Sequence, residues 1–305
     1  MKRCSICGKE ITGNEGNHPS CIRNLFGVDF IPQIDLSLGE ISLKAQEMVG
    51  KFSISGVQAK LSIKLNNETK SLEVTAKSGE YILKPQTAIF PDIPQNENLC
   101  MNIASNVGIE IPPHILVKLK DGSFAYVIKR FDRVKGEKLH QEDFAQILGT
   151  AKKYEGSIER IAKTLRRISD MPGLDLQFLF ERILLNFIIG NGDAHLKNFS
   201  IVHKPDGSVR LSPAYDIVSS KLVLPSEEDT ALTINGKKNN IKRSDFDIFA
   251  DTLEINTVEI FNNFLGRIDL ICDLIKDSYL NEKDKQKLTE IVHERISRLK
   301  VVTQS

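Results

Sequence analysis

An acidic and an amide side chain lie five positions apart in a short polar stretch of this chain. They are Asp193 and Asn198, the two ends of the sequence Asp-Ala-His-Leu-Lys-Asn, and the Asn-Gly pair before them predicts a tight loop. A carboxylate in such a loop can orient an attacking hydroxyl and accept its proton, while the amide can reach a metal on a triphosphate. The spacing suits phosphoryl transfer, although an Asn-Gly-Asp sequence is more often only a turn.

A second carboxylate, Asp216, follows a stretch that predicts a β-hairpin. Residues 199–203 and 209–211 alternate as strands do, and Pro-Asp-Gly at 205–207 supplies the turn. A loop, a hairpin and a metal-binding aspartate, in this order, are typical of the catalytic region of a protein kinase. The motifs differ from those of most protein kinases, since the sequence contains neither His-Arg-Asp nor Asp-Phe-Gly.

A lysine at the end of an apolar run offers a contact to phosphates. Lys84 follows Tyr-Ile-Leu at 81–83, and a buried ammonium needs a phosphate or a carboxylate as its partner. Glu97, near the start of a predicted helix, could be that carboxylate. The alternative is that Lys84 extends to solvent and that Glu97 only favours the helix N-terminus.

Two loops are further candidates for nucleotide contact. Residues 52–60 could cradle phosphates with backbone N–H groups and hydroxyls, or could be a strand start with two surface serines. Residues 129–133 are the predicted hinge between a small N-terminal lobe and a larger C-terminal lobe. There, backbone groups of Lys129 and Phe131 could contact the edge of an adenine, and Asp132 could contact the ribose hydroxyls. An inter-lobe ion-pair patch is the alternative there. The candidate contacts in the first loop are Ser55, Gly56, Val57, Gln58 and Lys60.

The N-terminal segment carries four soft or borderline metal ligands. Cys4 and Cys7 form one chelating pair, His18 and Cys21 form another, and glycines lie between the pairs. Two such pairs joined by a flexible loop predict a tetrahedral structural Zn²⁺ site, because a segment this small and polar has little other means of ordering itself. With four protein ligands, the zinc would do no catalysis. The alternative is a reduced N-terminus without metal.

The composition excludes several functional classes. A net charge of +1 over 305 residues provides no overall basic field for nucleic acid, so DNA contact would need a partner. The most apolar stretch, 176–189, is too short and too often interrupted to span a bilayer, and the sequence opens without a secretory signal. We expect a cytoplasmic protein whose five cysteines are thiols or metal ligands rather than disulfides.

The periodicity predicts an α+β protein with a small β-rich N-lobe and a larger helical C-lobe. Strands are expected at 61–65, 72–74, 81–83, 115–117 and 124–128. Helices are expected at 96–107, 141–148, 158–168, 176–189 with Asp175 as N-cap, 244 onward, 258–280 and 281–299. The expected domains are a cysteine module at 1–30, the N-lobe at 31–133 and the C-lobe at 134–305.

Several segments together resemble the HipA-like bacterial toxin kinases. They are 54–60 (Ile-Ser-Gly-Val-Gln-Ala-Lys), 82–85 (Ile-Leu-Lys-Pro), 130–133 (Arg-Phe-Asp-Arg), 140–144 (His-Gln-Glu-Asp-Phe), the Asp193 loop, 214–217 (Ala-Tyr-Asp-Ile) and 232–237 (Leu-Thr-Ile-Asn-Gly-Lys). The resemblance implies a two-lobed kinase-like fold and transfer of phosphate from ATP, with Mg²⁺, to a protein serine or threonine. The roles that it implies are phosphate contact for Lys84 and His195, general base for Asp193, and Mg²⁺ ligation for Asn198 and Asp216.

The short segment ahead of the phosphate loop makes the chain similar to HipT, the short toxin of three-part HipBST systems. That likeness implies antitoxin partners of the HipS and HipB types, DNA contact only through an antitoxin, and an aminoacyl-tRNA synthetase as the phosphorylated protein. The Ser-Ile-Ser triplet at 53–55 is also typical of HipT. A phosphoserine there would set negative charge against the triphosphate, so we expect inhibitory autophosphorylation at Ser53 or Ser55.

Two functions of other classes remain open. The chain could be a catalytically idle module that acts as a corepressor through a DNA-binding partner, or a phosphotransferase for small molecules. An idle module would need none of the residues Lys84, Asp193, Asn198 and Asp216, which weighs against the first. Growth arrest that is relieved by changing Asp193 would favour the toxin over the small-molecule enzyme.

Overall fold

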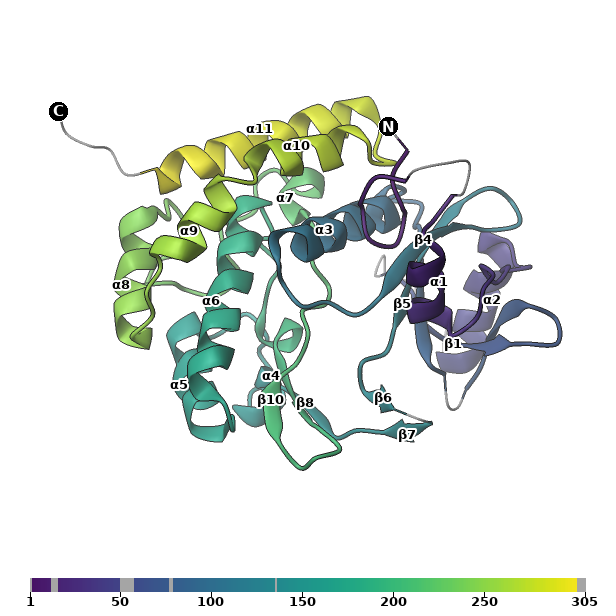
Figure 1. The fold of residues 1–305 in the computed structure, drawn as a ribbon, viewed down its shortest axis with the longest axis horizontal. Coiled ribbons are helices and arrows are strands. Elements are labelled where there is room, and N and C mark those ends of the chain that lie inside the picture. Colours follow the sequence, from purple (N-terminus) through teal and green to yellow (C-terminus); the bar gives the residue numbers. More distant parts are fainter. Residues whose placement is uncertain (1, 12–15, 50–57, 77–78, 135, 301–305) are drawn as a thin grey trace.

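The apolar side chains form two hydrophobic clusters, one in a sheet lobe and one in a helical lobe. Figure 1 shows the strands of the first lobe beside the helices of the second. The computed structural model describes residues 2–11, 16–49, 58–76, 79–134 and 136–300. Among the described residues, no helix has both the length and the apolar character that a membrane crossing needs.

The small lobe is built on a five-stranded antiparallel sheet with the strand order β2-β1-β3-β5-β4. Leu61 and Ile63 lie opposite Leu83 and Tyr81, and all four side chains belong to the smaller apolar cluster. One face of the sheet is therefore apolar, as the period of two requires. The strands are β1 (Leu61–Asn66), β2 (Ser71–Val74), β3 (Tyr81–Pro85), β4 (His114–Lys118) and β5 (Phe124–Lys129).

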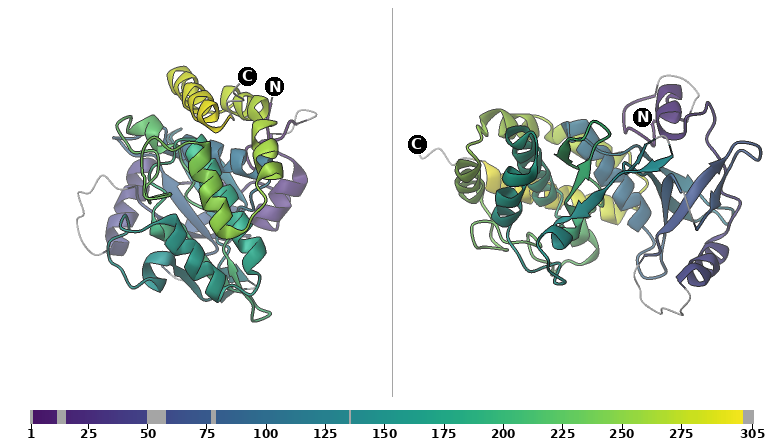
Figure 2. Two further views of the ribbon diagram at one scale, coloured as in Figure 1. Left: turned by 90° about the vertical axis from the view of Figure 1, so that its left-hand side faces the viewer. Right: turned by 90° about the horizontal axis from the view of Figure 1, so that it is seen from below.

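Two helices that the sequence pattern does not indicate cover this lobe (Figure 2). They are α1 (Pro19–Phe26) and α2 (Leu38–Val49). Phe26 of α1 and Ile41 of α2 pack in the same apolar cluster as the strands. The mixed polar and apolar residues of these segments leave only a weak helical period in the sequence.

Helix α3 (Ile93–Val107) lies between the sheet and the helical lobe (Figure 1). It begins three residues before the predicted start, with Pro94 in its first turn, where a missing N–H costs nothing. Leu99, Ile103 and Val107 pack in the larger cluster, although the sequence places this helix within the range of the N-lobe. The helix is thus held by the helical core and can present polar groups to the sheet.

The helical lobe also contains short strands. Its elements are β6 (Arg133–Val134), β7 (Glu137–Lys138), β8 (Gln141–Asp143), α4 (Phe144–Ile147), α5 (Ile158–Ile168), α6 (Pro172–Ile188), a 3-10 helix η1 (Leu196–Asn198), β9 (Ser200–His203), β10 (Val209–Leu211), α7 (Ser220–Val223), α8 (Arg243–Leu253), α9 (Val258–Leu265), α10 (Ile268–Lys276) and α11 (Glu282–Leu299). Strands β8, β9 and β10 form a sheet with β9 in the middle.

Two helix predictions in this lobe are wrong. The segment 141–148 is not one helix, because its first residues pair with β9 as strand β8 and Asp143 then caps the short α4. The segment 258–280 is two helices, α9 and α10, because the first ends at its C-cap, Gly266. Both errors concern boundaries that tertiary pairing decides.

A buried carboxylate fixes the helix that leads into the Asp193 loop. Asp175 is not the N-cap of α6, as the sequence suggests, since α6 begins at Pro172. It is completely buried and accepts hydrogen bonds from Nη2 of Arg210 at 2.7 Å and from the backbone N–H of Leu211 at 2.9 Å. These contacts tie the start of α6 to β10.

We expect Asp175→Ala to lower the free energy of unfolding by about 3–5 kcal/mol, because it removes a fully buried carboxylate and leaves the half-buried guanidinium of Arg210 and the buried N–H of Leu211 without their acceptor. Urea titration followed by circular dichroism measures the change. The control is Glu282→Ala, which removes an exposed ion pair with Lys285 and should leave the stability nearly unchanged. Equal losses in the two variants would contradict the anchoring role of Asp175.

Candidate functional site

Three charged groups from three segments of the chain meet at the end of β3. Lys84 is 4% exposed, and its ammonium lies 2.5 Å from Oε1 of Glu97 on α3. The same ammonium contacts Oδ1 of Asp216, which follows β10. The sheet lobe and the helical lobe are therefore joined through one ionic cluster.

Burial and charge act against each other in this cluster. Burial disfavours the charge of Lys84, but the carboxylates of Asp216 and Glu97 outweigh it and raise the pKa of the lysine. Burial would also raise the pKa of Asp216, yet Lys84 and Lys60 hold it well below its usual range. For Glu97 burial dominates and raises the pKa. Asp216 is thus the firmly ionised carboxylate of the pair.

Asp216 has further partners and an uncommon backbone conformation. Its φ is +55°, in the left-handed region, where a side-chain-bearing residue is strained and where such strain is often functional. Nζ of Lys60 lies 3.1 Å from Oδ2, and Nδ2 of Asn198 lies 3.4 Å from the same oxygen. Lys60 and Asn198 therefore approach Asp216 on the side away from Lys84.

The donor set fits Mg²⁺ in type. Asp216 and Asn198 offer hard oxygen ligands, and two ligands of one octahedral Mg²⁺ lie about 3 Å apart. Oδ1 of Asn198 accepts a hydrogen bond from the backbone N–H of His195 at 3.0 Å, so a turn of the amide would be needed to direct this oxygen at a metal. Both oxygens of Asp216 contact lysines, so one oxygen would exchange its ammonium partner for the metal.

The Asp193 loop is shaped by a close backbone contact. After α6 ends at Ile188, Gly192 packs so tightly that a Cβ atom there would lie 2.5 Å from the carbonyl oxygen of Glu228. Only glycine fits, and the loop turns sharply enough to present the next side chain. Oδ1 of Asp193 accepts a hydrogen bond from the hydroxyl of Tyr154 at 2.6 Å. Tyr154 thereby orients the carboxylate.

His195 is buried beside the same tyrosine. Its ring packs edge-on against Tyr154, with ring centroids 5.2 Å apart. Burial is the largest influence on His195 and lowers its pKa, although the carboxylate of Asp193 opposes the effect. A neutral imidazole offers a phosphate a hydrogen bond rather than a positive charge.

The charged cluster and the Asp193 loop line one cleft of about 800 Å³, which is large enough for a nucleotide. The residues described above that line it are Lys60, Lys84, Glu97, Asp193, His195, Asn198 and Asp216. Positive and negative side chains face each other across it, as the binding of a metal and a polyanion together requires. Its cations are Lys60, Lys84, Arg130, Lys138, Lys153 and Lys197, and its carboxylates include Asp193 and Asp216.

Lys129 and Phe131, which were predicted to contact adenine in the hinge, make contacts within the protein instead. The backbone N–H of Lys129 donates to the carbonyl of Pro113 within the sheet, and its side chain reaches the carbonyl of Asn24. Phe131 stacks on Tyr215, with ring centroids 5.5 Å apart. Neither Lys129 nor Phe131 lines the cleft.

Asp132 does line the cleft, but its carboxylate is engaged by arginines. Arg130 approaches both of its oxygens, at 2.9 and 2.8 Å, and Arg133 lies 2.5 Å from Oδ2. The alternative that the sequence left open, an ion-pair patch, therefore describes this segment better. The two arginines leave little of the carboxylate free for ribose hydroxyls.

Part of the predicted phosphate loop lies outside the described residues, namely Ser53, Ser55, Gly56 and Val57. Of its remaining candidates, Gln58 donates from Nε2 to the carbonyl of Pro85 at 2.8 Å, and Lys60 contacts Asp216. The sequence reasoning missed Tyr154 and Lys153, since nothing distinguishes them in a polar loop without a motif. A tyrosine between a lysine and a glutamate does not by itself indicate a functional residue. The contact of Tyr154 with Asp193 follows only from the fold.

The predicted zinc ligands are brought together away from the cleft. The ligating atoms of Cys4, Cys7, His18 and Cys21 all lie within 4.8 Å of one another. The structure also groups His140, Glu142 and His203, which were not predicted as metal ligands, in a more exposed position.

Comparison with known proteins identifies relatives among kinases. Residues 52–293 match the family described as HipA-like C-terminal domain. A putative kinase of Haemophilus influenzae is 33% identical over 205 residues, which cover 62% of this chain and 59% of that protein. The serine/threonine-protein kinase toxin HipA of Shewanella oneidensis is 28% identical over 208 residues, which cover 61% and 47%. The chain thus spans about half the length of the curated relatives that it matches.

A solved structure shares the arrangement of the two lobes. The Shewanella oneidensis toxin HipA, in a complex with HipB and operator DNA, superposes with a TM-score of 0.64 at 24% identity. The match covers 82% of this chain and 64% of HipA. This likeness confirms the predicted α+β fold with two kinase-like lobes.

We expect the difference in unfolding free energy between the wild type and Asp216→Asn to be largest near neutral pH and to shrink in acid. The folded protein holds the pKa of Asp216 below the ordinary value of about 3.9. The stabilisation is therefore present above that value and is lost as the pH falls through the folded-state pKa. Urea titrations between roughly pH 2 and pH 7 measure the difference. A difference that does not change over this range would contradict the ionic cluster.

Proposed function

Because this chain belongs to the HipA-like C-terminal domain family, we propose that it is an ATP-dependent protein serine/threonine kinase that acts as a toxin. The observation that carries the proposal is the contact of buried Lys84 with Glu97 and Asp216 in a cleft that Asp193 also lines. The names of the relatives, a putative kinase and a serine/threonine-protein kinase toxin, support the same activity.

We assign the binding roles from charge and position. Lys84 and Lys60 would hold phosphate oxygens, and Asp216 with Asn198 would hold Mg²⁺, which neutralises charge on the phosphates when bound. Glu97 keeps the ammonium of Lys84 in place while its other partner, Asp216, turns to the metal. His195, neutral through burial, would donate a hydrogen bond to a phosphate oxygen.

We assign the chemical step to Asp193. The serine hydroxyl of the protein substrate attacks the γ-phosphorus of ATP, the bond from this phosphorus to the β,γ-bridging oxygen breaks, and ADP leaves. The hydroxyl proton passes to Oδ2 of Asp193, because Oδ1 already accepts the hydrogen bond from Tyr154. The fixed orientation of the carboxylate lowers the entropic cost of this transfer.

The partners that we propose follow from the resemblance to the short HipT toxins. The substrate would be an aminoacyl-tRNA synthetase, and small antitoxins of the HipS and HipB types would neutralise the kinase. The solved relative supports a protein antitoxin, since it is a complex of HipA with HipB and operator DNA. Contact of this chain with DNA would then pass through the antitoxin, in agreement with its net charge of +1.

We expect Asp193→Asn to reduce phosphate transfer to protein by about 10²–10⁴-fold, because the amide cannot accept the serine proton. Nucleotide affinity should change little, since Asp193 makes no proposed contact to ATP. Transfer is measured with γ-labelled ATP in a bacterial lysate, followed by phosphoproteomics. Asp206→Asn, in the turn between β9 and β10, is the matched control and should keep the wild-type rate.

Three results would each exclude this function. Equal transfer by the wild type and Asp193→Asn would remove the proposed base. Label that enters only small molecules would identify a small-molecule phosphotransferase. No consumption of ATP by the wild type, together with repression by its DNA-bound partner, would leave an idle corepressor.

We also expect autophosphorylation at Ser53 or Ser55, with loss of activity, because a phosphoserine carries a charge of about −1.5 to −2 beside the triphosphate. Mass spectrometry of the purified wild type should find phosphate in the peptide that contains residue 53, and the Asp193→Asn protein should lack it. Replacement of both serines by alanine should keep the protein active for longer. Equal phosphate on the wild type and Asp193→Asn would show that another kinase modifies the loop.

A further inference from the structure

The cysteine and histidine side chains of the N-terminal segment have the spacing of a tetrahedral metal site. Sγ of Cys7 lies 3.4 Å from Nδ1 of His18, and Sγ of Cys21 lies 3.9 Å from the same nitrogen. In a tetrahedral zinc site with ordinary bond lengths, a sulfur and a nitrogen ligand lie about 3.6 Å apart and two sulfurs about 3.8 Å. Cys4 completes the set, with its sulfur within 4.8 Å of the other ligating atoms.

The surroundings of these ligands prepare them for a cation. Nε2 of His18 lies 3.0 Å from the carbonyl oxygen of Glu10, so a proton held on Nε2 leaves the lone pair of Nδ1 directed at the sulfurs. Asn17, whose Oδ1 lies 3.3 Å from the Cys4 sulfur, also accepts two hydrogen bonds from Ser5 and keeps these partners if Cys4 binds a metal.

The segment around the ligands touches both lobes. On the sheet side, the hydroxyl of Tyr81 donates to the carbonyl of Leu25, and Leu25 with Phe26 packs in the apolar cluster of the strands. On the other side, Nδ2 of Asn106 on α3 donates to the carbonyl of Cys7 at 2.8 Å. Nε of Arg3 lies 2.6 Å from Oδ2 of Asp277, the C-cap of α10.

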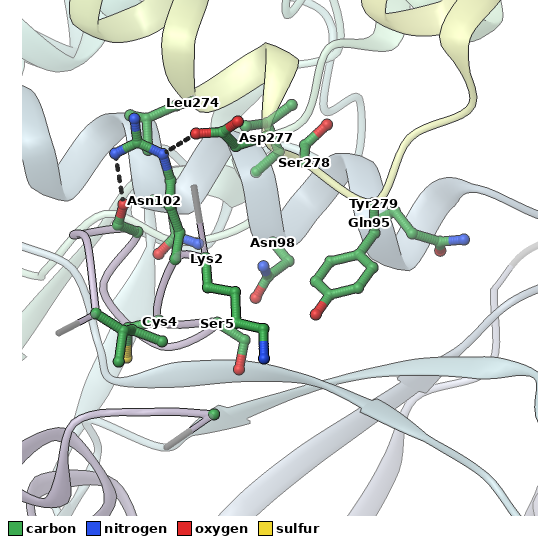
Figure 3. Close-up of a pocket in the computed structure, with 15 residues that line it drawn as sticks. Lys2, Cys4, Ser5, Gln95, Asn98, Asn102, Leu274, Asp277, Ser278 and Tyr279 are labelled. Carbon is green, nitrogen blue, oxygen red and sulfur yellow. Dashed lines mark hydrogen bonds and ion pairs between the residues drawn. The ribbon is translucent and has the colours of Figure 1, made fainter. Parts of the chain in front are cut away.

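Gly8 shows how closely the ligand loop approaches the helices. A Cβ atom at this position would lie 3.0 Å from a methyl carbon of Leu274 on α10 and 3.1–3.2 Å from side-chain atoms of Asn106 and Asn102 on α3. Beside this contact, a cavity of about 370 Å³ separates the segment from the helices, and Cys4, Ser5, Asn102 and Asp277 are among its walls (Figure 3). On the side of the helices, the segment is therefore held mainly by polar contacts, whereas Ile6, Leu25 and Phe26 pack in the apolar cluster of the sheet lobe.

We propose that Cys4, Cys7, His18 and Cys21 bind one structural Zn²⁺ and that this zinc clasp fastens the sheet lobe to α3 and α10. One metal ion would cross-link these four side chains, and the described cysteines form no disulfide that could do so instead. Metal binding thus supplies the free energy that holds Cys7 and Arg3 against the helices. Helix α3 also carries Glu97, the partner of Lys84. The clasp therefore stabilises the position of α3 relative to β3, and it does so from the side opposite the cleft.

The test uses the full-length protein, produced with zinc in the medium. Elemental analysis should find about one zinc per chain in the wild type and in Cys272→Ser, the matched control with a cysteine outside the cluster, and much less in Cys7→Ser. Replacement of zinc by Co²⁺ should give the visible absorption of tetrahedral cobalt with thiolate ligands. A wild type that takes up neither metal, or one in which mass spectrometry finds two of these cysteines in a disulfide, would overturn the site.

The role of the clasp is tested separately. Arg3→Ala should keep its zinc but should speed hydrogen exchange at the end of α10, where Arg3 contacts Asp277, while α6 stays protected. Metal removal should speed exchange there and also in α1, which carries Cys21. Removal of zinc should also lower Tm by more than about 5 °C. A zinc-loaded wild type whose Tm and exchange do not change on metal removal would leave the site without its structural role. None of these measurements depends on kinase activity, so their outcome is independent of the proposed function.

Discussion

The burial of one ammonium group is the constraint on which the rest of the structure depends. Lys84 is removed from water at the end of β3, and a buried charge is tolerated only where opposite charges meet it. Glu97 supplies one of these charges from α3, the next element along the chain, and Asp216 supplies the other from the segment after β10, 132 residues away. The sheet, helix α3 and the segment after β10 must therefore converge, and the floor of the cleft lies where they do.

The other parts of the site are positioned by contacts that serve this convergence. Helix α6 is tied to β10 by the buried Asp175 at its start. The loop after its other end lies beside the segment after β10, because the N–H of Gly192 donates to the hydroxyl of Ser220 and the N–H of Lys221 donates to the carbonyl of Gly190. The tight packing at Gly192 then turns Asp193 toward the cleft, and Tyr154 orients it. The left-handed backbone of Asp216 is a strain that the surrounding packing holds in place.

Much of this arrangement could be predicted from residues with a strong local signal. The period of two in the strands and the apolar run before Lys84 indicated the sheet and a lysine that needs a partner. Tertiary pairing decided what the sequence could not. The strand β8 exists only because β9 lies beside it, and the amide of Lys129 is used within the sheet because β5 extends to that residue. Tyr154 gave no signal, since its role depends entirely on where the fold places it.

The most direct measurement is an experimental structure of the wild type with Mg²⁺ and a non-hydrolysable ATP analogue. The central claim is that the Lys84, Glu97 and Asp216 cluster opens toward one metal-bound triphosphate. The account predicts phosphate oxygens within hydrogen-bond distance of the ammonium of Lys84, with Asp216 on the metal and Glu97 still paired with the lysine. An analogue bound outside this cleft, or one whose phosphates lie far from Lys84 while Asp216 remains on the lysine, would contradict it.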